Sequence, residues 1–458
     1  MRYFIDLKDK NQTVISESAD SMTRLEQKLT RFDLTLIAIG SVIGSGIFLT
    51  PAGIAQQVPS AMLILLLWVI GGVLSLTGAL TFAELGAMMP RAGGVYAFLK
   101  EAYGGLWGFL YGWAYFLVVN TGGLAALSIA FATYFGYFVP LTPVGIKITA
   151  ISGLVFLTAV NYFGIRSGGI FADVFTILKI LGIAVVILVG LGWGDPGNID
   201  TSTLLPRNTE NFGGALAIAM VGVLWSFGGW QHATYVASEV KDQQRTIPFA
   251  LITGTAIVVV IYLLINLAYL MLLPLETIAA SERVASDAVQ TVLGPAGAVF
   301  ISLAIFISVF GTAGIYTMTA PRIYYAMSVD KVFFKKVGEI HPKYKAPVFA
   351  ILFQTAWAIV LILSGTFYEL ITYVAFVDWI FFALAGFSVF LFRRRDPDGE
   401  RPYRTPGYPL TPALFVLIST WFVINTLISA PYQALAGLLF LALGVPVYFR
   451  WKRKERHS

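Results

Sequence analysis

Two glycine-rich interruptions of long apolar segments are the residues best suited to do chemistry in this sequence. Gly44-Ser45-Gly46 lies near the middle of LTLIAIGSVIGSGIFLTPAG, and Gly228-Gly229 lies near the middle of ALAIAMVGVLWSFGGWQHATYVASEV. Glycine costs a helix interior about 1 kcal/mol relative to alanine, so paired glycines mark points where a helix can come apart. A helix starting near Ile47 would offer free N–H groups to a carboxylate, and one ending near Phe227 would offer free carbonyls to an ammonium group. Together the breaks suit a zwitterion, whereas glycines that only allow close helix packing would form no site.

Two ionisable residues interrupt other apolar segments, Lys179 in DVFTILKILGIAVV and Asp378 in TYVAFVDWIFFAL. Burying either without a partner is costly, so each is a functional hypothesis. Lys179 could instead extend its ammonium to the membrane surface, or take a protonation role once buried. Asp378 could carry a coupling proton, hydrogen-bond a polar substrate, favour a cationic substrate, or hold a proton and bond to a neighbouring carbonyl.

Two further carboxylates, Glu84 and Glu239, lie near the ends of apolar segments. Arg91 follows Glu84, and Lys241 and Arg245 follow Glu239, all within reach along the chain. We expect these carboxylates to form structural or gate ion pairs rather than to bind substrate.

Membrane helices are the elements that would position these residues. The chain is 57% hydrophobic and 12% charged, with mean hydropathy +0.77, whereas soluble domains carry about 25% charged residues. Twelve stretches reach the roughly 20 apolar residues that span a bilayer as a helix, and they are too long and too uniform for strands. These stretches are 33–56, 61–86, 106–138, 143–163, 170–193, 212–238, 247–273, 295–325, 346–364, 368–392, 410–430 and 432–450.

The basic residues predict an orientation. If both termini lie in the cytosol, 27 of the 31 Lys and Arg residues fall in cytosolic segments and three (Lys147, Arg207, Arg283) in outer loops. Positively charged loops face the cytosol in membrane proteins. This bias explains the net charge of +6 without a nucleic-acid partner. We expect a multi-pass protein of the cell (inner or plasma) membrane, embedded in the lipid bilayer, with cytosolic tails at 1–28 and 453–458.

The two interrupted stretches are the first members of two possible five-helix halves, 33–193 and 212–392. Interrupted segments at matching positions in two halves indicate a transporter site, because an unwound turn is tolerated in lipid only where it lines a protected cavity. The predicted fold class is therefore an all-α membrane protein with 12 transmembrane helices. Two inverted five-helix repeats of the bacterial leucine-transporter kind and two peripheral helices (410–450) would form one transporter domain, 29–452.

Six motifs in the chain resemble those of the amino acid–polyamine–organocation superfamily, most closely its L-type branch of amino acid exchangers. They are IGSVIGSGIFLTPAG, WVIGGVLSLTGALTFAELGAMMPRAGGVYAFL, NYFGIRSGGIFADVFTILK, WSFGGWQHATYVASEVKDQQRTIPFAL, SVFGTAGIYTMTAPRIYYAM and RPYRTPGYPLTPALF. The resemblance covers nearly the whole chain after about residue 30 and implies alternating access. The substrate-binding residues that it implies, together with Asp378, are Val42, Ile43, Gly44, Ser45, Gly46, Ile47, Trp225, Ser226, Phe227, Gly228 and Gly229.

The resemblance also implies coupling and gating residues. Trp225 matches the aromatic residue that closes over substrate from outside; the alternative is a packing or lipid-facing tryptophan. Lys179 matches a lysine whose ammonium occupies the place where sodium-coupled relatives hold Na⁺, with Ser308 and Thr312 as hydroxyl partners. Transport independent of sodium is the expectation.

We therefore expect sodium-independent transport of L-amino acids, neutral and small to medium in size as Ser45 and Ser226 suggest, by exchange. Proton-coupled symport, with cationic amino acids accepted through Asp378, is the alternative. Without any cysteine, the chain cannot form the disulfide that joins animal relatives to a heavy chain, and we expect a working monomer. Three scattered histidines and no HExxH pattern predict no catalytic residue, cofactor or metal, and no repeated filter sequence or charged ring suggests a channel.

Overall fold

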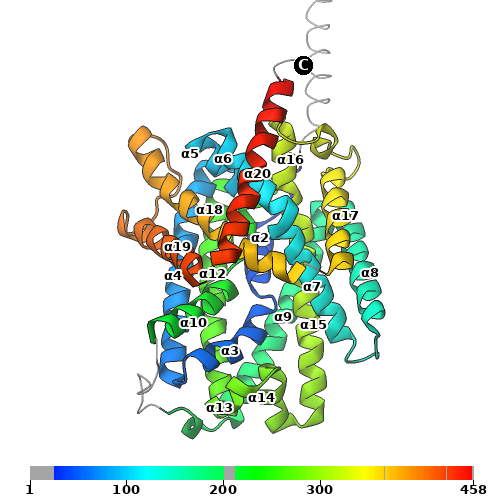
Figure 1. Cartoon of the computed structure of the whole chain (residues 1–458), viewed down its shortest axis with the longest axis vertical. Helices are drawn as coiled ribbons and strands as arrows, with labels where there is room; N and C mark the ends of the chain where they lie inside the picture. The colour runs from blue at the N-terminus through cyan, green and yellow to red at the C-terminus, as the bar shows by residue number, and fades with distance from the viewer. Residues whose placement is uncertain (1–24, 201–211, 366, 430, 456–458) are drawn as a thin grey trace, which may run out of the picture.

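The computed structural model describes residues 25–200, 212–365, 367–429 and 431–455, which are almost entirely helical (Figure 1). The one β-type contact among these residues is a parallel bridge between Leu29 and Val240. The all-α prediction is confirmed for this part of the chain.

Ten segments of the described chain are long and apolar enough to cross a membrane, and each overlaps a predicted stretch. The other two predicted stretches contain the shorter apolar helices α10 (Phe212–Ser226) and α17 (Val348–Ser364). The ten segments are α2 (Arg31–Val42) with α3 (Gly46–Gln57), α4 (Ala61–Met88), α6 (Gly105–Ala114) with η1 (Tyr115–Val119) and α7 (Asn120–Phe135), α8 (Pro143–Tyr162), α9 (Ile165–Trp193), α12 (Gln243–Leu272), α15 (Pro295–Thr319) with α16 (Pro321–Val329), α18 (Phe367–Arg395), α19 (Leu410–Ser429) and α20 (Pro431–Glu455).

Short elements connect these segments. The connecting helices and 3₁₀ turns are α5 (Val95–Tyr103), η2 (Pro196–Asn198), α11 (His232–Tyr235), η3 (Ala237–Glu239), α13 (Leu275–Ala280), α14 (Val284–Leu293) and η4 (Lys335–Gly338). α13 and α14 lie at the opposite end of the molecule from α5 and the end of α20 (Figure 1).

Local sequence signals explain several helix ends. Thr30 and Asp33 form a capping box at the start of α2, since each side chain accepts a hydrogen bond from the other residue's backbone N–H. The Thr142 side chain accepts from Gly145 N–H at the start of α8. Pro321 begins α16 because it lacks the N–H that would continue α15.

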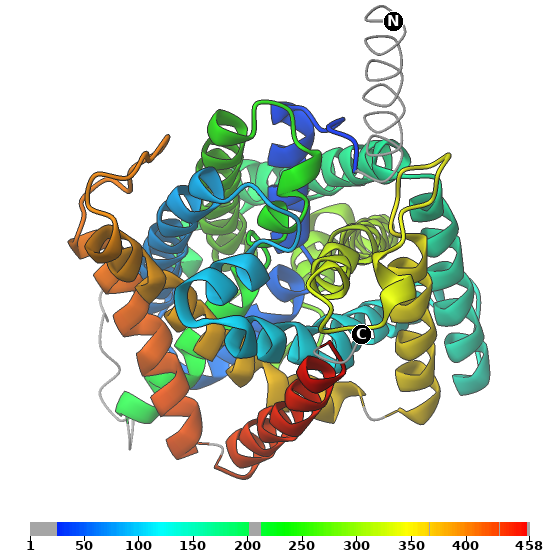
Figure 2. The ribbon, with the colours of Figure 1, turned by 90° about the horizontal axis from the view of Figure 1, so that it is seen from above.

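The spanning helices form two groups joined by α9. α2, α4 and α12 make one group, in which α12 packs on both α2 and α4, and α7, α8, α15 and α17 pack on one another as the second group. α9 contacts α2 and α12 on one side and α15 on the other. In Figure 1, α8 and α17 lie on one flank and α4, α18 and α19 on the other, with α2 between them. Figure 2 shows α19 and α20 at the periphery.

The contact between α2 and α9 depends on a glycine. A Cβ atom at Gly40 would lie only 2.1 Å from Thr176 Oγ1, so no larger residue fits there without movement. This close approach brings α9, and with it Lys179, against the first interrupted helix.

Candidate functional site

The first span is interrupted where the sequence predicts. α2 ends at Val42, and α3 begins at Gly46 without a side-chain cap. The first turn of a helix leaves its N–H groups without intrahelical acceptors. Among the described residues, the N–H groups of Ser45, Gly46 and Ile47 have no backbone partner outside α3. The break therefore presents hydrogen-bond donors and the positive end of the α3 dipole.

The carbonyls on the other side of this break are already occupied. Lys179 Nζ donates to Gly40 O at 2.7 Å, to Ile43 O at 3.0 Å and to Thr312 Oγ1 at 2.7 Å. The Lys179 ammonium is therefore buried but has three acceptors, and it does not extend to the membrane surface.

Hydroxyl groups complete the capping of these carbonyls. Ser308 Oγ donates to Ile43 O at 3.3 Å or to Gly44 O at 3.2 Å, and Tyr262 Oη donates to Val42 O at 3.1 Å. Ser308 thus lies beside the contacts of Lys179, and its hydroxyl donates to backbone carbonyls of the break. The end of α2 is held by side chains from α9, α12 and α15, which leaves the donors of α3 as the available polar groups of the break.

The second interrupted span has a longer break and a much shorter continuation than predicted. α10 ends at Ser226, and α11 spans only His232–Tyr235 before the chain enters η3. The expectation of a helix reaching residue 238 is wrong, because Val240 turns extended and pairs with Leu29. Among the described residues, no hydrogen bond occupies the carbonyls of Ser226, Phe227 or Gly228. This break presents acceptors.

Gly229 is the residue that brings the two breaks together. Its φ is +124°, which side-chain-bearing residues rarely adopt, and a Cβ there would lie 2.4 Å from Ser41 O. At the second contact, a Cβ at Gly46 would lie 3.0 Å from Ser226 Oγ. Ser226 Oγ also lies 2.9 Å from Thr50 Oγ1.

A cavity of about 300 Å³ lies where the two breaks meet. Ten predicted site residues line it, namely Val42, Gly44, Ser45, Gly46, Trp225, Ser226, Gly228, Gly229, Thr312 and Asp378. Ile43, Ile47, Phe227, Lys179 and Ser308 do not.

The predicted residues outside the cavity wall are buried behind it. Ile43 and Ile47 belong to the hydrophobic core, and Phe227 packs its ring 5.1 Å from the ring of Tyr262 and 5.6 Å from that of Trp68. Ile43 still contributes, because its carbonyl accepts from Lys179.

Several lining residues escaped the sequence analysis. His232 stacks on Tyr316 with ring centroids 4.0 Å apart, and its Nδ1 lies 2.6 Å from Thr319 Oγ1. Asn120 and Tyr115 come from the third span, which contains the π-helical turn η1. His232 could have been found, since it follows Gly229 by three residues. A single π turn leaves no readable sequence signal.

Asp378 faces the cavity with an unsatisfied atom. It is one of the lining residues, and its Oδ1 is buried without a hydrogen-bond partner among the described residues. The interpretation in which Asp378 bonds to a neighbouring carbonyl finds no such bond in the described chain.

The cavity is exposed at one end and sealed at the other. Leu49 and Trp225 line it and are 48% and 44% exposed, whereas Tyr115, Gln231 and His232 line its buried end. From Tyr115, a chain of hydroxyl contacts continues to Tyr235 at 2.7 Å and from there to Tyr111 at 2.6 Å. The path on this side is closed by hydrogen-bonded side chains.

A buried ion pair reinforces the sealed end. The Glu239 carboxylate accepts two hydrogen bonds from the Arg322 guanidinium, at 2.6 and 2.9 Å. Arg322 also donates to Met318 O. Lys28 and Leu29 donate their backbone N–H groups to Glu239 O. The start of the first span is thereby attached to the end of the second interrupted span.

The predicted partners of the two carboxylates are wrong. Glu239 pairs with Arg322, and Glu84 with Arg393 at 2.9 and 2.7 Å, whereas Arg91 pairs with Glu101 at 3.0 Å. The carboxylates pair with arginines that tertiary packing brings close, and not with the basic residues that are near them in the sequence.

A third polar cluster lies in the same region. Tyr96 Oη donates to Asp330 Oδ2 at 2.7 Å, and Lys100 Nζ to Asp330 Oδ1 at 2.7 Å. Burial, and then the Asp330 carboxylate, raise the pKa of Tyr96, so its phenol remains a donor. α5 is thereby fixed to the end of α16.

Two interrupted helices around a partly enclosed cavity, inside a multi-pass helical protein, define the class of this molecule as a membrane transporter. Residues 29–449 match the amino acid permease family. The chain is 33% identical over 431 residues to the serine/threonine exchanger SteT of Bacillus subtilis (strain 168), covering 93% of this chain and 96% of that protein. The chain belongs to the amino acid permease family and is a transporter rather than an enzyme.

Relatives in Mus musculus are similar over comparable lengths. Identity is 30% over 432 residues to the b(0,+)-type amino acid transporter 1, covering 93% of this chain and 88% of that protein. It is 30% over 434 residues to the large neutral amino acids transporter small subunit 2, covering 92% and 80%. The predicted superfamily is confirmed. Because the chain contains no cysteine, it forms no disulfide with a heavy chain.

Proposed function

We propose that the protein exchanges small to medium neutral L-amino acids across the cell membrane, without sodium, by alternating access. The observation that carries this proposal is the cavity of about 300 Å³ between the donor end of α3 and the acceptor end of α10. The substrate carboxylate would accept from the N–H groups of Ser45 and Gly46. The substrate ammonium would donate to the carbonyls of Ser226, Phe227 or Gly228.

The size and lining of the cavity support a small substrate. Small-molecule sites range from about 300 to 1,000 Å³, so this one lies at the lower limit. The Ser226 hydroxyl is hydrogen-bonded to Gly222 O at 2.9 Å and to Thr50 Oγ1 at 2.9 Å. These two contacts fix the Ser226 side chain in the cavity wall. Trp225, partly exposed at the open end, would close over the bound substrate.

Sodium independence rests on Lys179. Its ammonium takes the carbonyls of Gly40 and Ile43 as acceptors, which are the oxygen ligands that a sodium ion would otherwise need. A lysine ammonium at this point would stabilise the break without an ion drawn from solution.

The proposed organisation has 12 spans, with repeats at 33–193 and 212–392 in inverted orientation and α19 and α20 outside them. The basic loops support cytosolic termini, so the cavity would open to the outside in this structure. The protein would work as a monomer.

Reconstituted vesicles test the proposal. Purified protein in phosphatidylcholine–phosphatidylglycerol vesicles is loaded with each of the twenty amino acids, and uptake of the same labelled amino acid is followed without sodium. Uptake that requires an internal amino acid supports exchange. Equal uptake into empty vesicles, or uptake only with sodium, would overturn it.

A second candidate function is proton-coupled transport that accepts cationic amino acids, which the position of Asp378 favours. An Asp378→Asn variant separates the two. Under neutral exchange, the variant keeps its rate and shows no response to a pH gradient. The second function is established instead if the variant loses the uptake of lysine or arginine that the wild type shows. It is also established if the wild type responds to an imposed pH gradient and the variant does not.

A further inference from the structure

A second polar cavity lies far from the substrate site, where α18 ends and the chain turns toward α19. It measures about 310 Å³ and combines four arginines with two aromatic rings and a proline. Its lining residues are Phe390, Arg393, Arg394, Pro397, Arg401, Arg404 and Tyr408.

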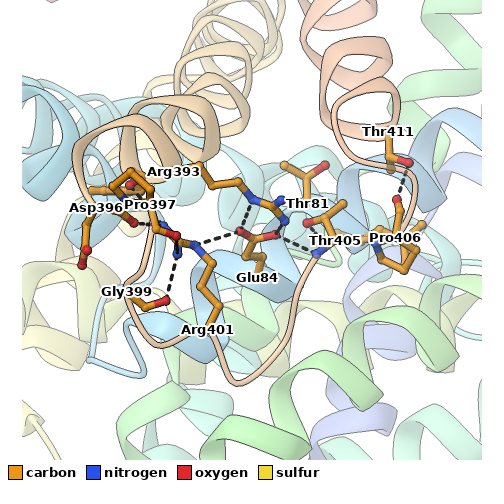
Figure 3. A network of polar contacts seen from close by, with 12 residues as sticks. Thr81, Glu84, Arg393, Asp396, Pro397, Gly399, Arg401, Thr405, Pro406 and Thr411 are labelled. Atoms are coloured by element: carbon orange, nitrogen blue, oxygen red, sulfur yellow. Dashed lines mark hydrogen bonds and ion pairs between the residues drawn. The ribbon is translucent and has the colours of Figure 1, made fainter.

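Glu84 positions two of these arginines from behind (Figure 3). Arg393 makes a bidentate pair with Glu84, and Arg401 Nε lies 3.7 Å from Glu84 Oε1. Thr405 N–H donates to Glu84 Oε2 at 2.7 Å. Arg401 also donates to loop carbonyls, including Gly399 O at 2.9 Å and Asp396 O at 2.6 Å. These guanidinium groups are therefore fixed before any ligand arrives.

The other two arginines, unlike this fixed pair, are open to the surface. Arg394 and Arg404 are exposed, and neither forms a hydrogen bond or ion pair with any residue that the structure describes. Among the residues that the structure describes, Glu84 is the one carboxylate that contacts the lining arginines, and it can balance only one of four positive charges. The cavity consequently keeps a strong excess of positive charge.

The loop's own carboxylates form no ion pair with the lining arginines in the described part of the chain. Asp396, Asp398 and Glu400 lie in the same loop but are not among the lining residues. The Asp396 carboxylate turns toward Gly399, where a Cβ would lie 2.2 Å from Oδ2. The charge of the cavity is left for an external anion.

An exposed apolar face continues from the cavity along α19. Tyr408 covers Arg393 at 3.8 Å from its ring centroid, and Leu410 follows it with 77% of its surface exposed. Exposed apolar residues then recur every three or four positions along the helix. They are Leu414, Leu417, Trp421, Ile424 and Ile428.

From these contacts we propose that the arginine cavity binds the phosphate-bearing headgroup of an anionic lipid, whose acyl chain lies along the exposed face of α19. Arginine suits this role because its planar donors match phosphate oxygens in pairs. Basic pockets at the cytosolic ends of membrane helices attract anionic headgroups. A free phosphate would use the same arginines but would leave the apolar face unused.

Native mass spectrometry of the full-length protein in neutral detergent tests this proposal, with dioleoyl phosphatidylglycerol and dioleoyl phosphatidylcholine as probes. An arginine near an anionic lipid surface contributes about fivefold in affinity. The double variant Arg394→Gln/Arg404→Gln should therefore bind phosphatidylglycerol about 25-fold more weakly and phosphatidylcholine unchanged. Arg450→Gln/Arg453→Gln, an equal charge change on α20, should leave phosphatidylglycerol binding within twofold of wild type.

Two outcomes would overturn the proposal. Equal losses in both double variants would mean a general attraction to the basic face. Displacement of phosphatidylglycerol by inorganic phosphate at low millimolar concentration would assign the cavity to free phosphate. A tenfold excess of inorganic phosphate over lipid that leaves the lipid bound supports the lipid headgroup.

Discussion

Lys179 is the single residue on which the first interrupted helix most depends. Its ammonium and the hydroxyls of Thr312, Ser308 and Tyr262 share the carbonyls at the end of α2. A carbonyl buried without a donor costs about 1–3 kcal/mol. Removing the lysine leaves Gly40 O and Ile43 O with only the Thr312 and Ser308 hydroxyls as donors among the described residues, even though the lysine side chain does not line the cavity.

We expect Lys179→Ala to lower sodium-independent exchange at least tenfold, because the two hydroxyls of Thr312 and Ser308 cannot satisfy the carbonyls of Gly40, Ile43 and Gly44 at once, and the break would rearrange. Labelled amino acid exchange in vesicles measures this. Lys147→Ala is the control, since the half-buried Lys147 of α8 donates to Leu363 O near the end of α17 at 2.9 Å, away from both breaks, and it should exchange normally. Normal exchange by Lys179→Ala without sodium would refute the role given to this lysine.

At the scale of the elements, Gly229 fixes how the two broken helices meet. A methyl group there would face both a positive φ and a contact of 2.4 Å with Ser41 O. We expect Gly229→Ala to reduce exchange at least tenfold and to lower the thermal midpoint. Gly213→Ala, in α10 with open space around its Cβ position, should change neither. A fully active Gly229→Ala would show that the breaks do not need to touch.

The elements also show what a sequence can and cannot reveal. The positions of the two breaks follow from local glycine pairs, and the link from Lys179 to Thr312 follows from family resemblance. The partner of Glu84 could not be predicted from the sequence, since Arg393 is 309 positions away and Arg91 is much nearer along the chain. The short length of α11 could not be predicted either, because it depends on the parallel bridge between Val240 and the distant Leu29.

On the scale of the whole molecule, the sealed end with its buried pair between Glu239 and Arg322 holds the cavity open toward Leu49 and Trp225. Breaking such a pair leaves a buried charge, which costs about 3–5 kcal/mol. We expect Glu239→Gln to shift the molecule toward the opposite opening.

Because the chain has no cysteine, a single Ala126→Cys in the cavity wall reports this shift directly. In right-side-out vesicles it should react with an impermeant maleimide, and in inside-out vesicles only slowly. Adding Glu239→Gln should reverse that order. Glu101→Gln, which removes only the exposed pair with Arg91, should leave it unchanged. Labelling from the same side in all three proteins would contradict the gate.

The central claim is that backbone groups at two helix breaks hold both charged ends of one amino acid. Inhibition of exchange by analogues of the fastest-exchanged amino acid tests it most directly. One analogue lacks the carboxylate and another lacks the amine, and both are smaller than the substrate, so neither is excluded by size. The account predicts that each inhibits at least 100-fold more weakly than the parent amino acid. Equal inhibition by either analogue would contradict it.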